Sequence, residues 1–247
     1  MFEEPRRSIR LYELVLDNGC PFSPFVWRIK YAIAHKGFDV EAVPVRPAEV
    51  RSILGGQHAE LPVIEDNRTV VAESWAIAEH IERAYMDRSL LFRTCGEHVW
   101  SRFFDRWMLR EVVPYLLSRE DRNFLRGSRE LRFLDERQLA NFFACQPGRA
   151  DLLHQALEPL RTLLQETPWL GGIRPNYVDF CGLSIFLWAA AVGTLPRFEA
   201  DSGLVDWLNR GFDLYGGLGR DQRLFSKLMP AQMSPRRPGS VVISAEA

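Results

Sequence analysis

The sequence predicts an α/β domain followed by an all-helical domain, on two observations. Strand-like and helix-like stretches alternate up to about residue 86, in the order β-α-β-α-β-β-α. From about residue 98 onward, every periodic stretch has helical spacing. We therefore expect an α/β domain at residues 1–88, an all-helical domain at 98–230 and a loose tail at 231–247.

The first two strands and the helix between them have clear local signals. Residues 9–16 are rich in aliphatic and aromatic side chains and predict a strand. Residues 24–35 repeat apolar side chains at spacings of three and four, and Gly37 just beyond them predicts the helix end. Residues 38–46 predict a second strand, in which Pro44 indicates an edge position or interrupted pairing.

The remaining elements of the first half follow in order. Residues 47–54 predict a short helix and residues 55–60 a loop. Residues 61–73 contain two apolar runs separated by residues 65–68, which predicts a hairpin. Residues 74–85 return to helical spacing.

The second half contains five stretches with helical spacing. They cover residues 97–117, 128–145, 150–167, 176–193 and 203–218. The hydrophobic fraction of 47% and the charged fraction of 26% are typical of a globular protein that buries a core. The sequence therefore predicts helices packed around an apolar interior in this half.

Composition excludes several classes of partner. A net charge of -1 gives no reason to expect binding to nucleic acid or to an anionic membrane. No apolar run approaches the roughly 18 residues of a membrane span, and the amino terminus lacks a signal-peptide pattern, so we expect a cytoplasmic protein. Four widely spaced cysteines predict free thiols, and scattered histidines predict no metal site.

The stretch Cys20-Pro21-Phe22-Ser23 resembles the dithiol motif of thiol–disulfide oxidoreductases, with an oxygen in place of the second sulfur. Pro24 is suited to the first position of the helix and makes Ser23 its N-cap. The Ser23 hydroxyl either caps the helix or donates its hydrogen to an anion held at that helix end, such as a ligand thiolate. Cys20 lies in the loop before the helix, as a small buried hydrophobe or as a thiol neighbour of the site.

Two further signals point to a ligand at the same end of the domain. Leu61-Pro62 opens the third strand, and a cis bond there would turn the Leu61 backbone outward to pair with a bound peptide. Glu73-Ser74 precedes the last helix of this half, with Ser74 as its expected N-cap. That helix end suits a carboxylate, and Glu73 suits an ammonium group. A group with both charges, such as an α-amino acid, fits these residues.

With these three signals in order, the chain resembles the glutathione transferase superfamily over nearly its whole length. The resemblance implies a thioredoxin-like first domain that binds glutathione as co-substrate, without a metal. In the second half "PNYVDF" resembles the buried capping box of that superfamily, with Asn176 as the N-cap and Asp179 three residues later. Counting back five residues from Arg28, as in the serine-type classes, leads to Ser23.

Within the superfamily, the chain resembles the bacterial glutathione-dependent β-aryl etherases of lignin breakdown and related fungal etherase-like transferases. The stretches "NGCPFSPFVWRIKYAIAHKGFDV", "ESWAIAEHIERAY" and "WLNRGFDLYGGLGR" carry this resemblance. It implies that glutathione thiolate, stabilised by Ser23, displaces a phenolate from the carbon β to an aryl ketone. It also implies binding of a hydrophobic aromatic molecule and assembly as a homodimer.

The resemblance also implies that the helical domain lines a pocket for the aromatic substrate, above the glutathione thiol. Its expected lining residues are Phe22, Phe25, Trp107 and Tyr115, with Met108 and Trp188 as further candidates. Three other functions stay open at this point. The first is a general glutathione transferase, and the second is a thiol transferase that uses Cys20, as in the "CPF" motif of glutaredoxins and omega-type transferases. The third is a non-catalytic protein that binds glutathione or an aromatic ligand.

Overall fold

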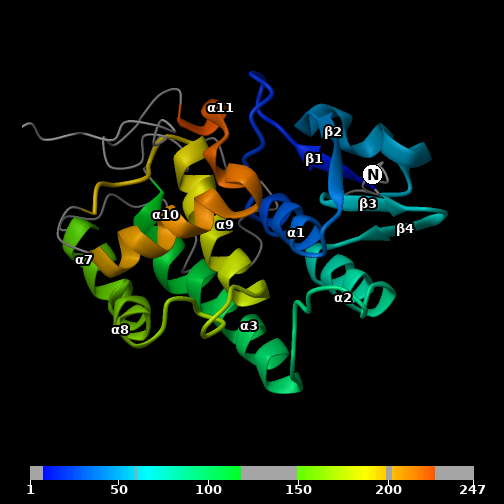
Figure 1. The fold of residues 1–247 in the computed structure, drawn as a ribbon. Coiled ribbons are helices and arrows are strands. Elements are labelled where there is room, and N and C mark those ends of the chain that lie inside the picture. Colours follow the sequence, from blue (N-terminus) through cyan, green and yellow to red (C-terminus); the bar gives the residue numbers. More distant parts are fainter. Residues whose placement is uncertain (1–7, 59, 118–148, 199–201, 226–247) are drawn as a thin grey trace, which may run out of the picture.

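The computed structural model describes residues 8–58, 60–117, 149–198 and 202–225 (Figure 1). The predicted helix at 128–145 and the predicted tail at 231–247 lie outside these residues. The first half contains a four-stranded sheet with helices, and every later element is helical. The predicted fold class is therefore confirmed.

The sheet consists of β1 (Ser8–Leu14), β2 (Asp39–Val45), β3 (Val63–Asp66) and β4 (Thr69–Ala72) in the order β2-β1-β3-β4. Strand β1 pairs with β2 in parallel and with β3 in antiparallel register, and β3 pairs with β4 as a hairpin. Pro44 lies on the edge strand β2, where its missing N–H leaves no gap in the interior of the sheet.

Helices α1 (Pro24–His35) and α2 (Ser74–Ala84) lie together on one side of the sheet, and the 3₁₀ segment η1 (Pro47–Gly56) lies on the other (Figure 1). Helix α1 has the predicted bounds, with Ser23 in the extended conformation of an N-cap and Gly37 at a φ of +79°. These bounds follow from local chemistry, because Pro24 presets the first turn and Gly37 takes the left-handed conformation without strain.

The predicted hairpin is confirmed, whereas the expected N-cap of α2 was wrong. The strands continue through residues 65 and 66, so the turn consists of Asn67 and Arg68 only, with Asn67 at a φ of +57°. The N-cap of α2 is Glu73, at a φ of +74°, and Ser74 is the first residue inside the helix. A serine is a favoured N-cap by propensity, but the strand before it decides where this helix begins.

The helical half contains nine described elements, of which α3 (Cys95–Trp107) and α9 (Tyr177–Ala191) are the longest that run without a kink. The others are η2 (Met108–Val112), α4 (Val113–Leu116), α7 (Arg149–Ala156), α8 (Glu158–Glu166), α10 (Ser202–Gly217), η4 (Leu218–Arg220) and α11 (Gln222–Phe225). None of the described helices is long and apolar enough to cross a membrane.

Three of the helices expected here are interrupted. The stretch 97–117 contains a π turn at η2, where the Val113 N–H donates to the Met108 carbonyl five residues earlier. Pro114 follows at once, and its ring and missing N–H are incompatible with regular α-helical bonding to Arg110. The stretch 150–167 breaks between α7 and α8, where Pro159 opens the second helix. In α10, residues 214–216 leave helical geometry.

Helix α9 is the centre of the core. Its residues from Tyr177 to Ala190 are all buried, as expected for a helix that is apolar on every side. The predicted capping box is confirmed: the Asn176 side chain accepts from the Val178 N–H at 3.1 Å, and the Asn176 N–H donates to Asp179 at 3.1 Å. Asp179 also accepts from the Trp207 indole at 2.9 Å, which fixes α10 against α9.

The stretch Trp207–Arg220 packs α10 against the far end of α1. The Tyr31 hydroxyl donates to the Gly211 carbonyl at 3.0 Å, and the rings of Tyr31 and Phe180 stack with centroids 5.5 Å apart. At the end of α1, His35 hydrogen-bonds the Tyr215 hydroxyl at 2.7 Å. This stretch carries the resemblance to etherases, and several of its residues make contacts between the two halves.

Gly211 provides a test of this close packing. A methyl group at Gly211 would overlap the side chain of Leu183, which is fully buried, whereas one at Gly203 in the same helix meets open space. We expect Gly211→Ala to lower the free energy of unfolding by about 1–3 kcal/mol and Gly203→Ala to leave it unchanged or raise it slightly. Urea unfolding of both variants measures the difference, and equal stabilities would show that α10 does not pack as described.

Candidate functional site

Ser23 is the first of the predicted site residues, and its side chain is buried without a partner. Its carbonyl accepts the N–H groups of Val26 and Trp27 at 3.1 Å, as expected for an N-cap. Its hydroxyl makes no capping bond and has no hydrogen-bond partner in the described part of the chain, although only 1% of the residue is exposed. Such a group costs free energy unless a ligand or water satisfies it. The hydroxyl is therefore available at the start of α1.

The Leu61–Pro62 bond is cis, the geometry that the sequence left open. The Pro62 carbonyl accepts from the Glu73 N–H at 3.2 Å, which ties the start of β3 to the start of α2. Across the described residues, the backbone of Leu61 makes no hydrogen bond. An extended peptide can pair with such a free edge.

Ser74 lies at the start of α2, beside Glu73. Its side chain is buried, and its carbonyl accepts from the Tyr177 hydroxyl at 3.2 Å, so α9 of the helical half holds this helix end in place. The first turn of α2 contains no acidic residue, so the acidic side chain at this helix end is that of the N-cap residue Glu73.

These residues surround one cavity of about 530 Å³. It is lined by Phe25 of α1, by Leu61, Pro62, Glu73, Ser74 and Trp75 around the start of α2, and by Val99, Arg102, Phe103, Asp105, Arg106 and Leu109 of α3 and η2. Five predicted site residues thus meet in one pocket between the two halves.

The other predicted residues do not line this pocket. Cys20 and Phe22 are buried in the core, and Ser23 lies two residues before Phe25 without reaching the pocket wall. Trp107 and Tyr115 are partly buried against the core. The further candidates Met108 and Trp188 are fully buried.

Sequence reasoning missed the contribution of α3. Val99 and Phe103 are 65% and 61% exposed and share one side of the helix, while Phe104 and Asp105 on the other side are buried. Apolar residues at i and i+4 opposite a buried stripe are the signal that predicts such a face. In the sequence, both stripes look equally suited to the core.

A buried ion pair joins α1 to α3 at the wall of the pocket. The Arg28 guanidinium donates two hydrogen bonds to the Asp105 carboxylate, at 2.6 and 2.8 Å, and its side chain is completely buried. Asp105 also accepts from the Trp75 indole at 3.1 Å. One carboxylate therefore fixes α1, α2 and α3 relative to one another.

The cations in the pocket are not equivalent. Arg102 lies 4.5 Å above the Trp75 ring and pairs with Glu79 at 2.7 Å. Arg106 is exposed at the pocket, and no hydrogen bond or ion pair of Arg106 is found among the described residues. Asp105 and Arg102 are each neutralised by a neighbour, whereas Arg106 lines the pocket without such a neighbour among the described residues.

Cys20 differs from a reactive cysteine. Its side chain is completely buried, and within the described residues the one hydrogen-bond contact of its sulfur is to the Pro21 carbonyl at 3.7 Å. Burial, together with the charge of Asp221, raises the pKa of the Cys20 thiol from 9.0 to about 11. The nucleophilic thiolate form is therefore scarce at neutral pH.

The family comparison identifies the first half. Residues 18–89 match the model of the glutathione S-transferase N-terminal domain. These residues therefore resemble a glutathione S-transferase N-terminal domain. They contain every element around the cis Leu61–Pro62 bond and the start of α2.

Relatives extend the likeness over both halves. A probable glutathione S-transferase of Glycine max is 22% identical over 189 residues, which are 75% of this chain and 73% of that protein. A glutathione S-transferase structure from Sinorhizobium meliloti has a TM-score of 0.63 at 16% identity, covering 92% of this chain and 98% of its own. The transferase GSTFuA3 of Phanerochaete chrysosporium has a TM-score of 0.59 at 20% identity, covering 89% and 96%.

These findings agree on the glutathione S-transferase superfamily, and at such identities the structural likeness establishes the fold. Within the described residues, no group of three or more His, Cys, Asp or Glu side chains is placed to hold a metal ion. The pocket itself offers a free backbone edge, a helix end and charged side chains, and the Ser23 hydroxyl lies near it, outside its wall.

The ion pair between Arg28 and Asp105 predicts a large loss of stability when it is broken. Asp105→Ala leaves a buried guanidinium without its carboxylate, and we expect the free energy of unfolding to fall by about 3–5 kcal/mol. Glu41→Ala is a control, because Glu41 pairs with Arg10 on the exposed edge of the sheet and should change stability much less. Urea unfolding measures both losses, and equal losses would contradict the role assigned to Asp105.

The raised pKa of the buried Cys20 thiol predicts that this group loses its proton only at high pH. The difference in thiolate absorbance between the wild type and Cys20→Ser should show a midpoint near pH 11. Since the folded state holds this proton more tightly than the unfolded state, its contribution to stability is present below pH 9.0 and is lost as the pH rises toward about 11. A midpoint near neutrality would overturn this description and restore Cys20 as a nucleophile.

Proposed function

We propose that this protein is a glutathione transferase in which bound glutathione thiolate attacks an aromatic electrophile. The single observation that carries the proposal is the buried hydroxyl of Ser23, which has no hydrogen-bond partner in the described chain at the start of α1. A thiolate at that helix end accepts the hydroxyl hydrogen and lies in the positive field of the helix. Both effects lower the pKa of a bound thiol.

The pocket offers a partner for each part of glutathione. The cysteinyl backbone would pair with the free backbone groups of Leu61, next to the cis bond to Pro62. The α-carboxylate of the glutamyl end would bind at the start of α2, beside Ser74. The ammonium group of the same end would pair with Glu73. Arg106 adds a cation for that carboxylate.

We further propose the specific reaction of a β-aryl etherase. The glutathione sulfur attacks the carbon β to an aryl ketone, forming a C–S bond as the C–O bond to the phenolate breaks. The phenolate leaves with the electron pair and takes a proton from water, so that the products are a glutathione thioether and a phenol. Ser23 keeps the nucleophile ionised, and binding of both substrates supplies proximity.

Two observations support an aromatic second substrate. The apolar side chains of Phe25, Val99, Phe103 and Leu109 line the same pocket as the proposed glutathione site. The stretch Trp207–Arg220, which carries the resemblance to etherases, packs on α1 and so fixes the helix that presents Ser23. Phe22, Trp107 and Tyr115 stay predictions as contacts of this substrate. The homodimer also stays a prediction, and α3 offers it an exposed apolar face.

Cys20 is a weaker choice for the reacting group. A thiol transferase needs an accessible thiolate, whereas the Cys20 side chain is fully buried and its thiol pKa is raised by burial. Cys20 and Ser23 are separated by Pro21 and Phe22 in the sequence, so each can be substituted by itself.

A matched pair of variants tests the proposal. With glutathione and a model β-aryl ether ketone, the wild type should release phenol, and Ser23→Ala should lower kcat about 10²–10³-fold because a hydrogen bond to the developing charge is lost. Cys20→Ser should retain most of the activity. Release of phenol is followed by chromatography at several pH values.

The outcomes separate the alternatives. Dependence on Cys20 and indifference to Ser23→Ala would support the thiol transferase instead. Conjugation of a generic electrophile without phenol release would retain the transferase and remove the etherase reaction. Binding of glutathione without any turnover would favour the non-catalytic binding protein.

A further inference from the structure

The loop between β1 and α1 is a short, tightly folded connection. The Leu16 N–H donates to the Cys20 carbonyl at 2.9 Å, and the Gly19 N–H donates back to the Leu16 carbonyl at 2.8 Å. Gly19 has a φ of +75°, which a residue with a side chain would adopt only under strain. The Cys20 N–H is held by the Asn18 side chain at 3.0 Å. These bonds are all local and leave the Gly19 carbonyl directed outward.

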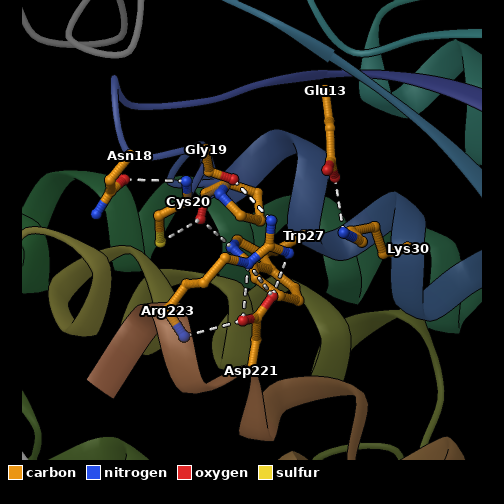
Figure 2. A network of polar contacts seen from close by, with 9 residues as sticks. Glu13, Asn18, Gly19, Cys20, Trp27, Lys30, Asp221 and Arg223 are labelled. Atoms are coloured by element: carbon orange, nitrogen blue, oxygen red, sulfur yellow. Dashed lines mark hydrogen bonds and ion pairs between the residues drawn. The ribbon is translucent and has the colours of Figure 1, made fainter. Parts of the chain in front are cut away.

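A residue from the other end of the chain binds that carbonyl. Arg223 of α11 donates a hydrogen bond to the Gly19 carbonyl at 2.8 Å, across 204 positions in the sequence. Figure 2 shows Arg223 between Asp221 and the turn that contains Asn18, Gly19 and Cys20. The carboxyl-terminal part of the described chain is thereby joined to the loop that precedes Ser23.

Asp221 orients the guanidinium for this contact. Its carboxylate accepts from Arg223 Nε at 2.9 Å and from the Nη2 group as well, so that the Nη1 group is left to reach Gly19. Asp221 is the less exposed partner, at 19% against 49% for the Arg223 side chain. The other charged groups near the loop, Glu13 and Lys30, pair with each other at 2.7 Å and do not compete for Arg223 (Figure 2).

We propose that Arg223, oriented by Asp221, is a positioning residue that holds the β1–α1 loop in place. It thereby keeps the Ser23 hydroxyl where it can donate a hydrogen bond to the glutathione sulfur. This inference rests on the proposed function, because Ser23 must act on a bound thiol for its position to matter. The contact ties the loop to α11, which packs on α9. The position of the Ser23 hydroxyl therefore depends on the helical half as well as on the sheet.

The same loop contains a built-in reporter. Cys20 is completely buried directly after Gly19, and a thiol reagent reaches it only when the loop opens. Labelling of Cys20 in the native protein, measured on its peptide by mass spectrometry, therefore reports how well Arg223 holds the loop. It does so without substrate, independently of activity.

The test compares Arg223→Gln with Arg223→Lys and with Arg210→Gln in the full-length protein. Arg210 is the matched control: it also donates to a backbone carbonyl, that of Pro168 at 2.6 Å, but away from the loop. Three quantities are measured: the pKa of the thiol of bound glutathione from thiolate absorbance, kcat and KM for glutathione, and the rate of Cys20 labelling.

We expect Arg223→Gln to raise the pKa of the bound thiol and to lower kcat at neutral pH by about tenfold, the effect of one lost charge-assisted hydrogen bond. KM for glutathione should change little, because Arg223 is not one of the residues that line the pocket. Cys20 labelling should become faster. Arg223→Lys keeps the charge without the fork of donors and should give intermediate values, and Arg210→Gln should match the wild type.

Two results would overturn the proposal in different ways. If Arg223→Gln matches Arg210→Gln in thiol pKa, kcat and Cys20 labelling while the wild type is active, Arg223 positions nothing and the proposed function stands. A change in KM alone would lead to the same conclusion. If wild-type protein fails to lower the pKa of the glutathione thiol, the proposed function itself is wrong, and the role of Arg223 is lost with it.

Discussion

The ion pair between Arg28 and Asp105 is the constraint on which the pocket depends. A guanidinium with no solvent exposure is tolerable only if its carboxylate stays within hydrogen-bond distance. That requirement fixes the separation of α1 from α3. Trp75 of α2 donates a hydrogen bond to the same carboxylate, which fixes α2 relative to the other two helices. The cavity lies where these three helices meet, so its width follows from the geometry of one buried charge pair.

Helix α1 is consequently held along its whole length by the helical half. Arg28 anchors its middle, and the contacts of Tyr31 and His35 with α10 anchor its far end. The loop before it is bound by Arg223. A helix fixed at three points cannot tilt to accommodate a ligand, so the field and the hydroxyl at its start are preorganised before a thiol arrives.

The features predicted correctly from the sequence are those that local chemistry decides. Pro24 and Gly37 bound α1, Asn176 caps α9, and Pro44 marks the edge strand, each through its own backbone preference. Features set by tertiary contacts were not predicted. Ser74 has the propensity of an N-cap, but the pairing of the preceding strand moves that position to Glu73, whose φ of +74° no propensity indicates.

Asp105 illustrates why half of the pocket was missed. Within "FFDRW" an aspartate between aromatic and basic residues has the pattern of a solvated helical position, and its partner Arg28 lies 77 residues earlier. For Cys20 the sequence motif suggested a reactive thiol, but burial raises the pKa of this thiol and makes it unreactive. A sulfur enclosed in the core keeps its proton, whereas a neighbouring hydroxyl without a partner can stabilise an anion. Under the proposed function, the reacting sulfur therefore belongs to the ligand, and the protein supplies the Ser23 hydroxyl and the field of helix α1.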